Sequence, residues 1–264
     1  METIIGKDCA VSACEQMASF HNALETLYRK HDIELSKNRG RRNVLMSGPM
    51  EHYLAEALRN TGLFDKVISD GRTGEPDIKV VLKGETTEIE CKLTSPHQSS
   101  GSVVFQTDHD TLKNKGSLDY IYIVANADFD GFCTIYFKGL TIDDYRSLSP
   151  GARGKVAMYK HKGMKKANVL MGKVVSYNEK KIEKLVEEQK TKIEEKTLQL
   201  SKWRSEIEDS PNAPAKRKKL NAQILRGLEY IDSLVNNMAE EVRIIRNKST
   251  DRYSLVYESI GDQK

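Results

Sequence analysis

The sequence predicts an α/β fold with a mixed central sheet flanked by helices, followed by a C-terminal antiparallel helical (coiled-coil) hairpin. Residues 78–82 and 87–93 alternate apolar and polar side chains with the period of strands. Helical patterns precede and separate the strand patterns, which argues against an all-β sandwich. Two heptad-repeat arms, whose apolar positions include Leu228 and Val235, flank a proline-containing break at residues 210–214. We expect domains at residues 1–177 and 178–250, with a final strand or tail at 251–264.

Composition limits the classes of protein to consider. The chain has 264 residues, of which 30% are charged and 38% hydrophobic, and no apolar run approaches the ~18 residues of a membrane span. The N-terminus lacks the basic start and long apolar segment of a secretion signal. The four cysteines lack the paired spacing of zinc ligands, and we expect them to be reduced. These features predict a cytoplasmic protein without a membrane segment.

Two amphipathic helices are expected in the N-terminal part. The first runs from about Asp8 to Arg29, and the second opens at Ser47-Gly48-Pro49 and ends at Gly62. Residues 37–43 between them read as a basic loop broken by glycine. Such a loop is either simply solvated or contacts phosphates, and in the second case its contacts come from Arg39, Arg41 and Arg42.

The stretch from Pro76 to Lys92 carries the candidate chemistry. Asp77 precedes one strand of a predicted hairpin, and the alternation of the returning strand places Glu90 and Lys92 on the same face. Two carboxylates and a backbone carbonyl, that of Cys91, are suitable oxygen ligands for Mg²⁺. Lys92 is then placed to orient or deprotonate water, or to stabilise charge. The alternative interpretation is an ordinary polar strand face with a Glu–Lys pair.

Pro76-Asp77 followed by Glu90-Cys91-Lys92 resembles the PD-(D/E)xK nuclease superfamily, which includes the type II restriction endonucleases. The resemblance implies a restriction-endonuclease-like sheet and Mg²⁺ as cofactor, for which Mn²⁺ can substitute. It implies that Asp77 and Glu90 bind the metal and that Lys92 is the catalytic lysine. Glu51, on the preceding helix, matches an auxiliary acid, and Gln106 matches a glutamine found in some branches.

A basic segment without any Asp or Glu follows, from Tyr145 to Asn178. Such a run indicates a surface for phosphate contacts. Its candidate DNA-binding residues are Arg153, Lys155, Lys160, Lys162, Lys165 and Lys166.

The leading hypothesis is a Mg²⁺-dependent endonuclease that cuts double-stranded DNA, most simply a type II enzyme of a restriction–modification system. Paired cuts need two active sites, so a homodimer is expected, although the helical hairpin can equally clamp DNA or pack within one chain. Alternatives are a junction-resolving, repair or defence nuclease of the same fold, or a non-catalytic DNA-binding or scaffold protein that uses the hairpin. A lesser alternative is an acid–histidine–acid site at Asp108-His109-Asp110, near His97.

Overall fold

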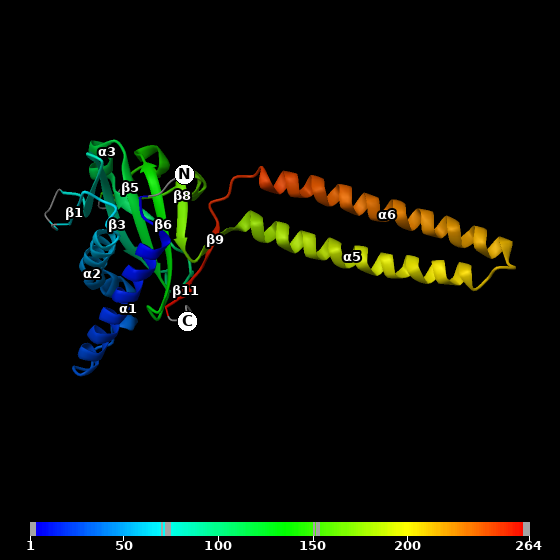
Figure 1. Cartoon of the computed structure of the whole chain (residues 1–264), viewed down its shortest axis with the longest axis horizontal. Helices are drawn as coiled ribbons and strands as arrows, with labels where there is room; N and C mark the ends of the chain where they lie inside the picture. The colour runs from blue at the N-terminus through cyan, green and yellow to red at the C-terminus, as the bar shows by residue number, and fades with distance from the viewer. Residues whose placement is uncertain (1–3, 70, 72–74, 150, 152–153, 261–264) are drawn as a thin grey trace. The chain divides into compact units, whose positions relative to one another are not determined.

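The computed structural model describes residues 4–69, 71, 75–149, 151 and 154–260. The chain forms two compact units, one built from the chain up to residue 175 and from residue 251 onward, the other from residues 176–250 (Figure 1). The segment after residue 250 therefore belongs with the first unit, where it adds two short strands. Each unit is described by itself below.

A seven-stranded mixed sheet forms the centre of the first unit. Strand β3 pairs in parallel with β5, and the other neighbours are antiparallel. This confirms the predicted α/β class with a mixed sheet. The strands follow the order β1 (Lys66–Ile68), β2 (Ile78–Leu82), β3 (Glu85–Thr94), β5 (Leu118–Ala125), β6 (Gly131–Leu140) and β11 (Glu258–Ser259), with β8 (Ala167–Met171) also paired to β6.

Two smaller sheets and several short helices complete this unit. The sheets pair β4 (Gln106–Asp108) with β7 (Lys155–Ala157), and β9 (Lys173–Ser176) with β10 (Tyr253–Val256). The short helices are α3 (His109–Lys115) and α4 (Lys160–Gly163), with 3₁₀ segments η1 (Leu35–Lys37), η2 (Ile142–Asp144) and η3 (Met164–Lys166). The basic segment after Tyr145 thus contains ordered short elements.

Helices α1 (Lys7–Arg29) and α2 (Arg39–Asn60) supply the core on one face of the central sheet. A second apolar cluster, which includes Tyr120, Tyr122 and Phe137, covers the opposite face. Strand β5 contributes alternate residues to both clusters and is buried almost throughout. Burial on both faces explains why residues 118–125 read as an apolar run instead of an alternating one.

The second helix begins earlier than the sequence predicts. It starts at Arg39, where the side-chain oxygen of Asn38 accepts a hydrogen bond from the Arg41 N–H at 3.0 Å, and Pro49 lies inside it. The interpretation of residues 37–43 as a loop is therefore wrong. The buried positions at Arg42, Met46 and Met50 recur every four residues and extend the core-facing stripe upstream.

The second unit consists of α5 (Tyr177–Glu208) and α6 (Pro214–Arg246) (Figure 1). Asn178, in the first turn of α5, donates hydrogen bonds to the carbonyls of Ile245 (3.1 Å) and Lys248 (2.6 Å) at the end of α6. The helices therefore run antiparallel. In the described part of the chain, no helix is both long and apolar enough to cross a bilayer.

Candidate active site

A two-residue turn sets the register of the β2–β3 hairpin. Lys83 and Gly84 both have positive φ, 52° and 81°, as a type I′ turn requires. The turn pairs Leu82 with Glu85 and, further along, Ile78 with Ile89. Asp77 precedes Ile78 and Glu90 follows Ile89, so this register brings Asp77 opposite Glu90. A slip of the register by one residue would move every side chain of the strand to the other face of the sheet. The turn, by fixing the register, therefore places the two acids on one face.

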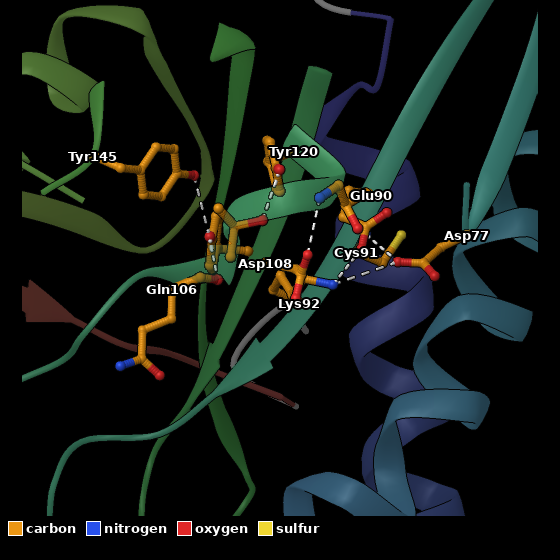
Figure 2. A network of polar contacts seen from close by, with 11 residues as sticks. Asp77, Glu90, Cys91, Lys92, Gln106, Asp108, Tyr120 and Tyr145 are labelled. Carbon is orange, nitrogen blue, oxygen red and sulfur yellow. Dashed lines mark hydrogen bonds and ion pairs between the residues drawn. The ribbon is translucent and has the colours of Figure 1, made fainter. Parts of the chain in front are cut away.

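Asp77, Glu90 and Lys92 converge at the end of this hairpin (Figure 2). The Lys92 Nζ atom lies 2.5 Å from Glu90 Oε1 and 4.0 Å from Asp77 Oδ2. Asp77 Oδ2 also accepts a hydrogen bond from the Cys91 N–H at 2.7 Å, which anchors this carboxylate to β3. The structure thus brings together the three residues that the motif predicted to meet.

Electrostatics link the three groups. Burial raises the pKa of the Glu90 carboxyl and the negative charge of Asp77 adds to this, while Lys92 opposes it. Burial alone would lower the pKa of Lys92, but the adjacent Glu90 and Asp77 outweigh it and hold that pKa above its usual value. Lys92 is therefore a cation at neutral pH. This favours charge stabilisation and orientation of water over deprotonation of water in the resting site.

Glu51, on α2, lies within the electrostatic field of this cluster. Burial, followed by repulsion from Asp77 and a smaller contribution from Glu90, raises the pKa of Glu51 to about 7. A half-buried carboxyl with this pKa is partly protonated at neutral pH. The helix that precedes the hairpin therefore brings a fourth ionisable group toward the site, as the sequence suggested.

Glu51 should make the stability of the metal-free protein depend on pH. The pKa of Glu51 in the folded state, about 7, lies above the ordinary glutamate value of 4.5, so the folded state binds the extra proton between these two pH values. The resulting stabilisation is complete below pH ~4.5 and is lost as the pH rises to ~7. We expect Glu51→Gln to remove this decline. The free energy of unfolding in urea, measured for both proteins between pH 4.5 and 8, tests this expectation. If the difference in this free energy between wild type and variant does not change with pH, the assignment is contradicted.

The acid cluster contains oxygen donors of the kind that bind divalent cations. Asp77 and Glu90 offer carboxylate oxygens, and Mg²⁺ needs few protein ligands because it retains water. The Cys91 side chain points into the core and is 3% exposed, so only its backbone oxygen is available. The described residues include no group of three or more His, Cys, Asp or Glu side chains arranged to hold a metal ion. Asp77 and Glu90 thus offer two of the oxygen ligands that a hard cation prefers, and the described acids, Glu51 included, form no larger ligand set.

Gln106 does not join this cluster. It lies on β4, its side chain is exposed, and that side chain is directed away from the two carboxylates (Figure 2).

The side chains of the alternative acid–histidine–acid site do not converge on one point either. Asp108 caps α3 by accepting a hydrogen bond from the Thr111 N–H at 2.9 Å, and the His109 ring Nδ1 atom lies 2.8 Å from Asp110 Oδ1.

The predicted basic contact residues divide by environment. Arg42 is fully buried, and its guanidinium donates to the carbonyls of Asn126 and Ala127 and to Ser95 Oγ. Its assignment as a DNA contact is therefore wrong, because the side chain continues the buried stripe of α2. Lys166 is half-buried and bonds to Asp144 Oδ2 at 2.7 Å.

Most of the other basic candidates lie at the surface. Arg41, Lys155, Lys162 and Lys165 are exposed and Lys160 is partly exposed. Arg39 is partly engaged through Nη1, which donates to the Pro96 carbonyl at 3.1 Å. Arg153 lies outside the described residues.

The sequence did not point to the tyrosines beside the cluster. The parallel β3–β5 register pairs Glu90 with Tyr120 and Lys92 with Tyr122. The Tyr120 hydroxyl lies 2.7 Å from Thr107 Oγ1, and the Tyr122 hydroxyl donates to the Gln106 carbonyl at 2.8 Å. Their proximity depends on a long-range strand pairing that has no local sequence signal.

Comparison with protein-family models, with curated proteins and with solved structures finds no match to this chain.

Proposed function

We propose that this chain is a Mg²⁺-dependent endonuclease that hydrolyses phosphodiester bonds of double-stranded DNA, and specifically a type II restriction enzyme with a restriction-endonuclease-like core. The convergence of Asp77, Glu90 and Lys92 at one end of the hairpin supports this proposal above all. The second support is the shifted pKa of Glu51, because acids crowded around one point are a common feature of catalytic sites.

The residues divide the chemistry among them. A bound divalent cation would neutralise charge on the phosphate and lower the pKa of a bound water molecule. Asp77 and Glu90 would hold the cation, and Mn²⁺ should substitute for Mg²⁺ because both accept oxygen ligands. Lys92, a cation beside Glu90, would stabilise negative charge on the phosphate as the bond breaks. Glu51 would lose its proton on cation binding and add negative charge to the site.

Incubation of supercoiled plasmid with the protein tests the activity. The expected result is nicked and linear DNA in the presence of Mg²⁺ or Mn²⁺ and intact plasmid after addition of chelator. Sequencing the ends of the products gives the recognition sequence, and a four-way junction as substrate separates a restriction enzyme from a junction-resolving one. Absence of chelator-sensitive cleavage on DNA of varied sequence would contradict the proposal.

A non-catalytic DNA-binding or scaffold protein is the second candidate. The observation in its favour is that Glu90 is already paired with Lys92 and that the described residues hold no three-acid metal cluster. A protein of this kind would bind duplex DNA with the same affinity in Mg²⁺ and in chelator. Chelator-sensitive cleavage of plasmid therefore indicates a nuclease. Binding that does not depend on the metal, without cleavage, indicates a DNA-binding or scaffold protein.

We also propose that the chain forms a homodimer through its helical hairpin. Leu228 and Val235 of α6 are 40% and 42% exposed, since one partner helix covers only part of the apolar stripe. Exposed apolar stripes of this kind are commonly covered by another helix. A second copy would cover the stripe and provide a second active site for the opposite DNA strand.

Light scattering after size-exclusion chromatography tests the dimer. We expect a dimeric mass for the wild type and a monomeric mass for Leu228→Lys/Val235→Lys, because two buried charges would be unpaired at the interface. Glu229→Lys/Glu240→Lys, at exposed positions of the same helix that point away from Leu228 and Val235, is the matched control and should remain dimeric. A wild type that is monomeric at micromolar concentration would refute this part of the proposal.

A further inference from the structure

A cavity separate from the acid cluster lies in the first unit. Its volume is about 340 Å³, at the small end of the ~300–1,000 Å³ range of ligand pockets. The segment around η2, including Tyr145 and Arg146, forms one wall, and Tyr159 and Lys162 form another. Arg146, Tyr159 and Lys162 all lie in the basic segment from Tyr145 to Asn178 that the sequence indicates as a surface for phosphate contacts.

Two cations are held over one aromatic ring in this cavity. The Lys162 Nζ atom lies 4.9 Å from the centroid of the Tyr159 ring, and the Arg146 Cζ atom lies 5.8 Å from it. Lys162 also donates to the backbone carbonyl of Asp143 at 2.9 Å. Such contacts restrict long side chains without neutralising their charge. Arg146 and Lys162 are therefore positioned as cations before any ligand arrives.

Two acids lie near these cations. Asp251 Oδ1 accepts hydrogen bonds from the backbone N–H of His161 (2.9 Å) and from its ring Nδ1 atom (2.7 Å). Its other oxygen forms an ion pair with Arg146 Nη2 at 3.7 Å, which offsets part of the charge of Arg146. Among the described residues that line the cavity, Asp143 is the one acid, against Arg146 and Lys162. The described lining therefore has more cations than acids, and Asp251 competes with a ligand for Arg146.

The chemistry of the walls selects the ligand. Arginine and lysine together suit a phosphate, to which the guanidinium presents a fork of N–H donors. The cavity has room for more than an inorganic ion, and Leu148, which is 45% exposed, gives it an apolar wall. A sugar or base could lie against that wall while the phosphate contacts the cations.

Tyr145 connects the cavity with the candidate active site. Its hydroxyl lies 3.5 Å from the Tyr122 hydroxyl, and Tyr122 pairs with Lys92 in the parallel register of β3 and β5. Tyr122 and Lys92 are neighbours on adjacent strands, so one row of side chains leads from the cavity to the acid cluster.

We propose that this cavity binds the phosphate of one nucleotide of the DNA substrate, at a position other than the phosphate that is cut. Arg146 and Lys162 contact the phosphate, and the sugar or base lies against the wall that contains Leu148. This inference rests on the proposed function for the identity of its ligand as DNA. The binding of a nucleotide phosphate by the cavity can be measured independently of cleavage.

Calorimetric titration of the whole protein with inorganic phosphate and with adenosine 5′-monophosphate tests the site. We expect both probes to bind, the nucleotide more tightly, and Arg146→Ala/Lys162→Ala to weaken binding of each at least tenfold. Lys113→Ala/Lys138→Ala removes the same charge at exposed positions outside the cavity and should bind as the wild type does. Asp143→Asn should tighten binding, because it removes the acid from the lining. No binding by the wild type, or equal binding by the cavity variant and the control, overturns the proposal.

A 30-base-pair duplex at several salt concentrations distinguishes a substrate phosphate from a free nucleotide. The slope of log affinity against log salt should fall by ~0.9 in Arg146→Ala/Lys162→Ala relative to the control, since one phosphate contact is lost. If no DNA is cut but this slope changes, the cavity proposal stands and the nuclease proposal fails. If the slope of the cavity variant equals that of the control, the ligand is not a phosphate of DNA and the proposal is overturned.

Discussion

Replacement of Asp77 by asparagine is expected to slow Mg²⁺-dependent DNA cleavage at least about a thousandfold, equivalent to ~4 kcal/mol of transition-state stabilisation. In the proposed mechanism, the charge of this carboxylate holds the cation, and its Oδ2 atom also accepts the hydrogen bond from the Cys91 N–H. The asparagine side chain retains an oxygen that can accept this bond. The change therefore removes charge while preserving the anchor to β3. Single-turnover cleavage of a plasmid that the wild type cuts measures the effect.

Two measurements make this result specific to the active site. Glu85→Gln, an exposed acid on the same strand β3, is the matched control and should cleave at the wild-type rate. DNA affinity measured in Ca²⁺ should be retained by Asp77→Asn, because repulsion between the acid and phosphates is reduced. An Asp77→Asn protein that cuts as fast as the wild type would refute the site assignment.

Replacement of Arg42 by methionine should lower the free energy of unfolding by at least about 3 kcal/mol, because it leaves three partly buried acceptors without their donor. The guanidinium bonds to the carbonyls of Asn126 and Ala127, which connect β5 to β6, and to Ser95 Oγ just beyond β3. It also lies over the ring of Phe129, 4.8 Å from the centroid. Methionine fills similar space but donates no hydrogen bond. Urea unfolding measures the loss.

Arg41 provides the control for this experiment. Arg41 is the neighbour of Arg42 in the sequence, and its side chain is exposed. Arg41→Met should therefore change the free energy of unfolding by less than ~0.5 kcal/mol. The two arginines are indistinguishable in the basic run of the sequence, yet only one should matter for stability. An Arg42→Met protein with wild-type stability and weakened DNA binding would show that Arg42 faces the substrate after all.

The helical hairpin shows where a repeat is informative and where it is not. The heptads and the break at residues 210–214 predicted two helical arms, and α5 and α6 occupy those segments. The contact between α5 and α6 differs from the one that the predicted apolar stripe implies. Gly227 is buried and comes close to Leu200, whereas Leu228 and Val235 of the predicted stripe remain partly exposed. The sequence period gives a face of the helix, but the partner's position decides which edge of that face is covered.

The sequence by itself determined the features that depend on near neighbours. Alternation with period two placed Glu90 and Lys92 on one strand face, and a turn with Gly84 brought Asp77 opposite Glu90. Only the tertiary structure decided the features that depend on distant segments. The parallel pairing of β3 with β5 set Tyr122 beside Lys92, and the packing of α2 buried Arg42. The physical reason is that local periodicity fixes the direction of a side chain, whereas burial and partners depend on which distant segment packs against it.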